Sequence, residues 1–167
     1  MIELKKITYD NMSEILKLQV ADDQKGFVAN NLESLADAYV GINSGYPTIP
    51  YGIYADDSAV GLIMYYYNNP EDHEEPEDID LPSYLKECTY FMQRLMIDKN
   101  HQGKGYGKEA VKKMIAEIKT KPYGPAESIY TSIEPKNFGA ETLYSSLGFI
   151  KTGEVDGGEL VMKLEGI

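Results

Sequence analysis

The chain of 167 residues contains little cysteine, little positive charge and no long hydrophobic run. Cys88 is the one cysteine, so an internal disulfide is excluded and nothing indicates an oxidising compartment. No apolar stretch approaches the ~20 residues that span a bilayer, and the opening "MIELKKITYD" lacks the apolar run of a signal peptide. We therefore expect a cytoplasmic protein that does not insert into a membrane.

Positive charge is scarce, because the chain has 16 Lys and Arg residues and 27 Asp and Glu residues, which gives a net charge of -11. Nucleic acid attracts clustered cations, so this balance argues against non-specific nucleic-acid binding. It favours solubility first and a cationic partner second. Residues 71–80, "EDHEEPEDID", carry seven of the carboxylates. Like charges repel, so we expect a solvated loop there, with recruitment of a cationic substrate as the alternative.

The chain shows no internal repeat and no linker rich in Pro, Gly or Ser, so we expect a single domain over residues 1–167. Hydrophobic periodicity predicts helices over residues 10–18, 32–41, 108–118 and 138–147, the second ending at Gly41 and the last followed by Gly148 as its C′ glycine. Strands are predicted over residues 2–8, 89–97 and 128–133 and in hairpins around residues 56–58 and 156–158. This order favours an α/β fold with helices on a mixed sheet.

The segment "HQGKGYGKEA", residues 101–110, places glycines at alternate positions between a buried strand and an amphipathic helix. The unpaired N–H groups and dipole of a helix start attract anions, and a glycine lets a pyrophosphate approach the backbone closely. The alternative is a tight turn without a ligand. The spacing excludes a P-loop and a G-x-G-x-x-G dinucleotide fingerprint, because Gly107-Lys108 is followed by Glu109 and the three glycines are evenly spaced.

After the strand "RLMID", residues 102–107 resemble the Q/R-x-x-G-x-G/A pyrophosphate loop of the GNAT superfamily of acetyl-CoA-dependent N-acetyltransferases. "NFGAETLYSSLGF" resembles the family's second coenzyme motif, with Asn137 and Tyr144 seven residues apart. The resemblance covers nearly the whole chain and implies a partly splayed central sheet flanked by helices. It also implies direct transfer of an acetyl group from acetyl-CoA to a primary amine, without a metal.

A closer likeness is to bacterial spermine/spermidine acetyltransferases, through Gln24, "FVAN", "SLADAY", "VGLIMY" and "GEVDGGELVM". It implies a polycationic small-molecule amine as acceptor. An antibiotic, an amino acid or a protein amino terminus are alternative acceptors. A coenzyme A sensor without activity, and an interaction domain with an empty glycine turn, are alternative functions. A homodimer is left open.

The resemblance also implies roles for individual residues. The N–H of Leu95 polarises the thioester carbonyl, and the backbone of Ile97 binds the pantetheine arm. Lys104 and Lys108 either add charge near the pyrophosphate or stay solvated. The residues expected to contact the coenzyme are Leu95, Met96, Ile97, Gln102, Gly103, Lys104, Gly105, Tyr106, Gly107, Lys108 and Asn137.

Tyr144 resembles the family's general acid, which protonates the departing thiolate. Packing in the core is the alternative for Tyr144, and Asn137 is also a natural helix N-cap.

The general base stays open, because Gln93 occupies the strand position where some relatives carry a carboxylate, and an amide cannot take a proton. His73 and His101 have suitable pKa values, but we expect both to be loop residues. Cys88 has no sequence partner that would activate it as a nucleophile.

Overall fold

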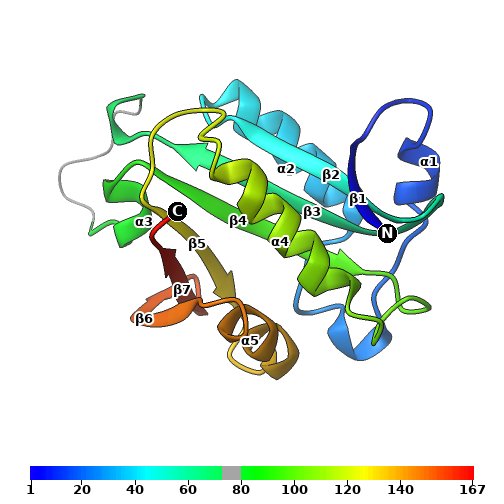
Figure 1. The fold of residues 1–167 in the computed structure, drawn as a ribbon. Helices are drawn as coiled ribbons and strands as arrows, with labels where there is room; N and C mark the ends of the chain where they lie inside the picture. Colours follow the sequence, from blue (N-terminus) through cyan, green and yellow to red (C-terminus); the bar gives the residue numbers. More distant parts are fainter. Residues whose placement is uncertain (73–79) are drawn as a thin grey trace.

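The computed structural model describes residues 1–72 and 80–167 (Figure 1). Seven strands form one sheet in the order β1-β2-β3-β4-β5-β7-β6. The strands are β1 Ile2–Lys6, β2 Thr48–Ala55, β3 Ser58–Asn68, β4 Thr89–Ile97, β5 Ser128–Ile133, β6 Ile150–Asp156 and β7 Glu159–Glu165. The α-helices are α1 Met12–Ile15, α2 Asn31–Asn43, α3 Ser83–Lys86, α4 Tyr106–Ile118 and α5 Phe138–Ser145, with 3-10 turns η1 Asp22–Gln24 and η2 Pro70–Asp72.

Strand β4 lies in the middle of the sheet, as its apolar sequence predicts. It pairs with β3 in the antiparallel sense and with β5 in the parallel sense, and the remaining neighbours are antiparallel. A parallel pair needs a crossover connection, which the segment containing α4 supplies. The predicted mixed α/β sheet with helices on its faces is confirmed.

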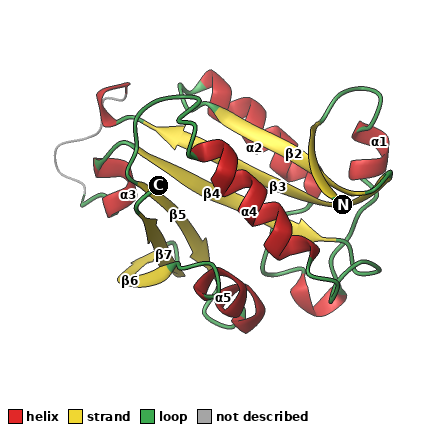
Figure 2. Ribbon diagram, in the orientation of Figure 1, coloured by secondary structure: helices red, strands yellow, loops and turns green. Residues whose placement is uncertain are grey.

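Helices cover both faces of the sheet, with α4 in front and α2 behind in Figure 2. The side chains of α4 that face the sheet are fully buried, and they are Ala110, Val111, Met114 and Ile118. They pack on strand residues such as Ile63 and Tyr65, and α5 adds Tyr144 to the same cluster. Ile15 of α1 and Ala38 of α2 pack on the opposite face. The amphipathic pattern predicted for α4 is confirmed.

The prediction that a helix ends at Gly41 is wrong. Helix α2 continues to Asn43, and a Cβ on Gly41 would come within 2.4 Å of Thr48 Oγ1. The missing side chain therefore lets α2 pack closely against the start of β2 and does not terminate the helix. At the end of α5, Gly148 takes the predicted positive φ of +96°, although the helix itself stops at Ser145.

Two further boundaries differ from the sequence-based expectation. The helix predicted over residues 10–18 is a single turn, Met12–Ile15, and the short helix α3 was not predicted. Both predicted hairpins are present, and Asp56 (φ +55°) and Gly157 (φ +56°) take left-handed conformations in their turns. Within residues 1–72 and 80–167, no helix combines the length and hydrophobicity that crossing a membrane requires.

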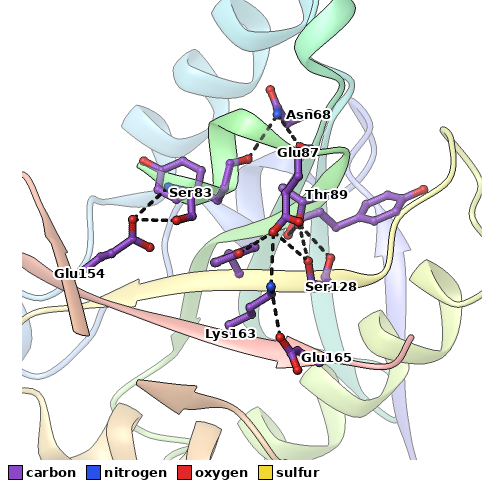
Figure 3. Close-up of polar contacts among 11 residues, drawn as sticks. Asn68, Ser83, Glu87, Thr89, Ser128, Glu154, Lys163 and Glu165 are labelled. Carbon is purple, nitrogen blue, oxygen red and sulfur yellow. Dashed lines mark hydrogen bonds and ion pairs between the residues drawn. The ribbon is translucent and has the colours of Figure 1, made fainter. Parts of the chain in front are cut away.

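Polar contacts tie β4, β5 and β7 together at the end where β4 begins (Figure 3). The Thr89 hydroxyl donates to the Ser128 carbonyl at 2.8 Å, which links β4 to β5. Glu87, just before β4, accepts from the Tyr130 hydroxyl of β5 and lies 3.4 Å from Lys163 Nζ of β7. These contacts hold the three strands together at this end, so any separation of β4 from β5 must occur at the other end.

Candidate active site

Strands β4 and β5 separate part-way along their length. Their parallel pairing covers residues 90–92 of β4 and 129–131 of β5, while β4 continues to Ile97 and β5 to Ile133. Beyond Met92, the edge of β4 that faces β5 has no paired strand in the described chain. The splayed sheet that the resemblance implied is confirmed, and a cleft of about 370 Å³ is lined by both strands.

A β-bulge at Gln93 lies where the separation begins. Met64 of β3 lies opposite Arg94, and the next β3 residue, Tyr65, lies opposite Met92. Gln93 therefore has no partner in β3. A bulge bends its strand and increases the local twist, which explains why the second half of β4 departs from β5. Gln93 is half-buried and lines the cleft.

The backbone of β4 presents Leu95 and Ile97 to the cleft. Asp98 N–H donates to the Val60 carbonyl at 2.8 Å, so these two residues form a hydrogen-bonded pair. Such pairs alternate along an antiparallel ladder, which places the N–H and C=O of Met96 toward β3 as well. The N–H and C=O of Leu95 and Ile97 then point the other way, toward the open edge. Met96, which lines the cleft, can therefore contact the coenzyme only through its side chain.

The glycine turn leads into α4 with a left-handed backbone at two positions. Gly103 has φ +75° and Gly105, the N-cap of α4, has φ +78°, and a Cβ on either would meet nothing within 4 Å. At Gly107 a Cβ would lie 3.4 Å from Leu143 of α5, an ordinary contact distance. The left-handed backbone therefore favours glycine at the first two positions, whereas neither conformation nor packing requires it at Gly107.

The first N–H groups of α4 are free to bind an anion. Within the part of the chain that the structure describes, the N–H groups of Gly105, Tyr106, Gly107 and Lys108 donate to no protein acceptor, and the first helical bond comes from Glu109 N–H to the Gly105 carbonyl. Four converging donors at the positive end of a helix dipole suit a phosphate. This arrangement fits the diphosphate of acetyl-CoA.

Side chains from three segments fix the glycine turn. Gln102 Nε2 donates to the Ile97 carbonyl at 2.9 Å and to Gln24 Oε1 at 2.7 Å, which fastens the turn to β4 and to η1. The amide of Gln102 is thus used within the protein. Lys108 is half-buried and lines the cleft, whereas Lys104 is exposed and does not.

Asp98 was not singled out from the sequence, yet it organises the turn between β4 and the glycines. Its carboxylate accepts from the N–H groups of Gln19 at 2.9 Å and Asn100 at 3.0 Å, and His101 Nδ1 lies 3.4 Å away. Burial opposes ionisation, but these hydrogen bonds hold the pKa of Asp98 below its ordinary value. Asp98 therefore stays charged and ordered at neutral pH.

Helix α5 places Tyr144 and Asn137 in the wall of the cleft. Asn137 Oδ1 accepts from Ala140 N–H at 3.2 Å, so the predicted N-cap is confirmed. Tyr144 is 6% exposed. Burial raises the pKa of the Tyr144 phenol above its ordinary value, the negative charge of Glu159 raises it further, and Thr131 opposes the shift. Tyr144 therefore remains protonated at neutral pH, as a proton donor must.

Eleven of the twelve predicted site residues line this one cleft, and Lys104 is the exception. The segment "FVAN", which carries part of the resemblance, brings Phe27 and Val28 into the cleft wall. Met92 of β4 and Thr131 and Ser132 of β5 also line the cleft, and no sequence motif pointed to these three residues. Their place in the cleft depends on strand order and could not be predicted from spacing.

The residues considered as a base are separated in the structure. His101 lines the cleft beside the glycine turn, and Cys88 lies just before β4, where its thiol is 3.5 Å from Asn69 Oδ1. His73 and most of the acidic segment, residues 73–79, lie outside the described residues. Gln93 reaches the cleft but has no proton-accepting group.

The acetyltransferase (GNAT) family matches residues 13–149, which is most of the chain. The chain belongs to this family. As a member it is an acetyl-CoA-dependent N-acetyltransferase, and the predicted enzyme class and cosubstrate are confirmed. Among curated proteins, this acetyltransferase is 32% identical over 165 residues to a spermine/spermidine N(1)-acetyltransferase of Bacillus subtilis (strain 168), which covers 98% of each chain. A probable spermine N(1)-acetyltransferase of Bacillus subtilis subsp. natto matches over the same share.

Solved structures share the fold of this acetyltransferase at low sequence identity. The PaiA N-acetyltransferase of Thermoplasma acidophilum in complex with coenzyme A has a TM-score of 0.66 at 14% identity and covers 99% of both chains. An aminoglycoside acetyltransferase in complex with coenzyme A has a TM-score of 0.72 at 16% identity, over 99% of this chain and 95% of the other. These likenesses support the fold and carry no further statement about the acceptor.

Proposed function

We propose that residues 1–167 form one domain that acetylates a polyamine, such as spermidine or spermine, on a primary amine. The proposal rests on the similarity to relatives named as spermine or spermidine N(1)-acetyltransferases. This similarity is 32% sequence identity over 98% of each chain. The net charge of -11 supports it, since a polycation is attracted by an acidic protein. We also propose a cytoplasmic location, and a homodimer stays a prediction that light scattering can test.

Different residues of the cleft, along α4 and β4, would bind different parts of acetyl-CoA. The N–H groups from Gly105 to Lys108 would hold the diphosphate, with Lys108 adding positive charge. The open edge at Ile97 would align the pantetheine arm. When bound, acetyl-CoA supplies an acetyl thioester. The Leu95 N–H would donate to the thioester oxygen as negative charge develops there, a contribution of about 3 kcal/mol for a well-placed donor.

Tyr144 would hold the proton that the sulfur needs on leaving. Its phenol stays protonated because the environment raises its pKa, and its place in the cleft wall supports contact with the coenzyme. A phenol with a raised pKa is a weak acid. Tyr144 would therefore transfer its proton to the sulfur while the carbon–sulfur bond breaks.

An amine panel tests the proposal. The purified protein is mixed with acetyl-CoA and, in turn, spermine, spermidine, putrescine, an aminoglycoside, a free amino acid and a peptide with a free amino terminus. Thiol release and product mass are measured. We expect kcat/KM for spermine or spermidine to exceed that for the aminoglycoside, amino acid and peptide by at least tenfold. A higher value for one of those three, or coenzyme binding without turnover of any amine, would contradict the proposed substrate.

A further inference from the structure

A second hollow, of about 270 Å³, adjoins the cleft. Its walls come from residues 25–29, from the bulge in β4, from β5 and from the first residue of β7. Five residues line both the hollow and the cleft, and they are Phe27, Val28, Gln93, Arg94 and Ser132. The hollow therefore borders the cleft at the β4 bulge, near the open edge of Leu95.

Glu159 is the one carboxylate among the described residues that line the cleft or the hollow. It is half-buried at the start of β7, and the Ser132 hydroxyl donates to its Oε2. A hydrogen bond from a neutral hydroxyl orients the carboxylate without cancelling its charge. No Lys, Arg or His of the described segments lies within ion-pair distance of Glu159. Its second oxygen is thus available to an amine.

The cations beside Glu159 already have partners of their own. Arg94 Nη2 lies 2.8 Å from Asp37 Oδ2, and Lys25 Nζ lies 2.6 Å from Asp22 Oδ1. Across the β6–β7 hairpin, Asp156 is opposite Glu159 and accepts from the Tyr84 hydroxyl. The hollow therefore offers negative charge to a ligand, which suits an amine better than an anion.

Glu159 and Tyr144 act on each other electrostatically. The Glu159 charge disfavours the Tyr144 phenolate, which is why it raises the pKa of Tyr144 after burial has done so. Conversely, a proton on Glu159 removes this repulsion and makes Tyr144 a stronger acid.

Resting on the proposed function, we infer that Glu159 accepts a proton from the amine nitrogen as that nitrogen attacks the acetyl group. The amine reaches this step uncharged, having released its extra proton to solvent. Nitrogen uses its lone pair to bond to the acetyl carbon, one proton on nitrogen moves to Glu159, and the carbon–sulfur bond breaks. The sulfur keeps the bonding pair and takes the Tyr144 proton. Return of the proton from Glu159 to Tyr144 restores the enzyme.

The substitution Glu159→Gln tests the inference, because an amide keeps the shape of the side chain and its hydrogen bond from Ser132 but does not accept the proton. We expect kcat for spermidine to fall by about 10²–10³-fold, with the Kd for coenzyme A unchanged in calorimetry. The ratio of wild-type kcat to variant kcat should fall as pH rises to 9, because hydroxide replaces the missing base in the variant, whereas loss of the extra amine proton raises kcat in both proteins. Glu165→Gln, an exposed carboxylate on the same strand, is the matched control.

The outcomes separate this inference from the proposed function. A wild-type enzyme that acetylates no amine overturns the proposed function and the inference with it. An active wild type whose Glu159→Gln variant keeps kcat within threefold overturns only the inference. A rise in KM at unchanged kcat also overturns it, because Glu159 would then bind the amine without taking its proton.

Should Glu159→Gln not fold, the pair Glu159→Asp and Glu159→Asn decides the question. Both variants shorten the side chain equally, and only the first retains a proton acceptor. We expect the Asp variant to keep at least ten times the kcat of the Asn variant. Equal kcat values in two folded variants would overturn the inference.

Discussion

At the scale of single residues, the site combines groups that the sequence reveals with groups that only the fold brings together. Tyr144 and Asn137 could be predicted because they lie seven apart in a motif. Glu159 lies in a hairpin near the end of the chain, and nothing in the sequence connects it to Ser132, its hydrogen-bond donor. Long-range side-chain contacts of this kind depend on strand order, which local pattern does not encode.

Tyr144→Phe should remove the proton donor and leave the shape of the cleft. We expect kcat to fall roughly 10²–10³-fold, the range for loss of a general acid, with the Kd for acetyl-CoA unchanged in calorimetry. Tyr9→Phe, at a side chain that is 95% exposed, is the control and should leave kcat unaltered. Unchanged turnover in Tyr144→Phe would exclude Tyr144 from the mechanism.

The raised pKa of Tyr144 also predicts a pH dependence. Since the phenol keeps its proton above the pH at which an ordinary tyrosine ionises, wild-type kcat at saturating substrates should not decline between pH 7 and about pH 10. The measurement is kcat against pH with thiol release corrected for spontaneous hydrolysis. An alkaline decline centred at or below about pH 10 would show that the acid has an ordinary or lowered pKa.

Asp98 predicts an acid-sensitive part of the stability. Its folded-state pKa is lowered, so its stabilising contribution is complete above the unfolded-state pKa near 3.8 and is lost as pH falls through the folded-state value. Urea unfolding of wild type and Asp98→Asn at pH 7 and pH 3.5 measures this. We expect the two proteins to differ less in free energy of unfolding at pH 3.5. An equal difference at both values would assign the effect to packing.

At the scale of elements, the central feature is a pair of parallel strands held at one end and separated at the other. The sequence predicts β4 and α4 well, because a long apolar run and a clear 3.6-residue period are strong signals. The bulge at Gln93 leaves no such signal, since it depends on the register between β3 and β4. Gly41 shows the same limit, because a glycine at a helix–strand contact looks like a helix terminator in the sequence.

Gly105→Ala tests the glycine turn as an element. The new methyl group meets no protein atom, so the folded state pays about 1–2 kcal/mol for the left-handed conformation and keeps its structure. Binding of acetyl-CoA should weaken at least tenfold in calorimetry, because the methyl group lies where the ligand would approach. Gly166→Ala has a similar φ of +75° and open surroundings, and it serves as the control. Equal affinity in both variants would contradict the assignment of the diphosphate.

Glu87→Ala tests the closed end of the strand pair. The substitution leaves the Tyr130 hydroxyl and Lys163 without this acceptor, so we expect a loss of about 1–2 kcal/mol in free energy of unfolding. Glu127→Ala, at a side chain that is 86% exposed, should change stability by less than about 0.5 kcal/mol. Urea melts of both variants provide the comparison, and equal effects would mean that the Glu87 contacts do not stabilise the strand pair.

At the scale of the whole molecule, charge and fold favour one kind of substrate. A protein with a net charge of -11 attracts a polycation over a distance that salt shortens. We expect the KM for spermidine to rise severalfold between 50 and 500 mM NaCl, while the KM for a monoamine changes less. Identical salt dependence for the two amines would show that long-range attraction plays no part in capture.

The position of the coenzyme is the most direct test of the account. A crystal structure of the protein in complex with coenzyme A should place the diphosphate within about 3.2 Å of N–H groups between Gly105 and Lys108, with the pantetheine arm along the open edge at Leu95 and Ile97. A coenzyme bound away from the α4 start and the β4 edge would contradict the account.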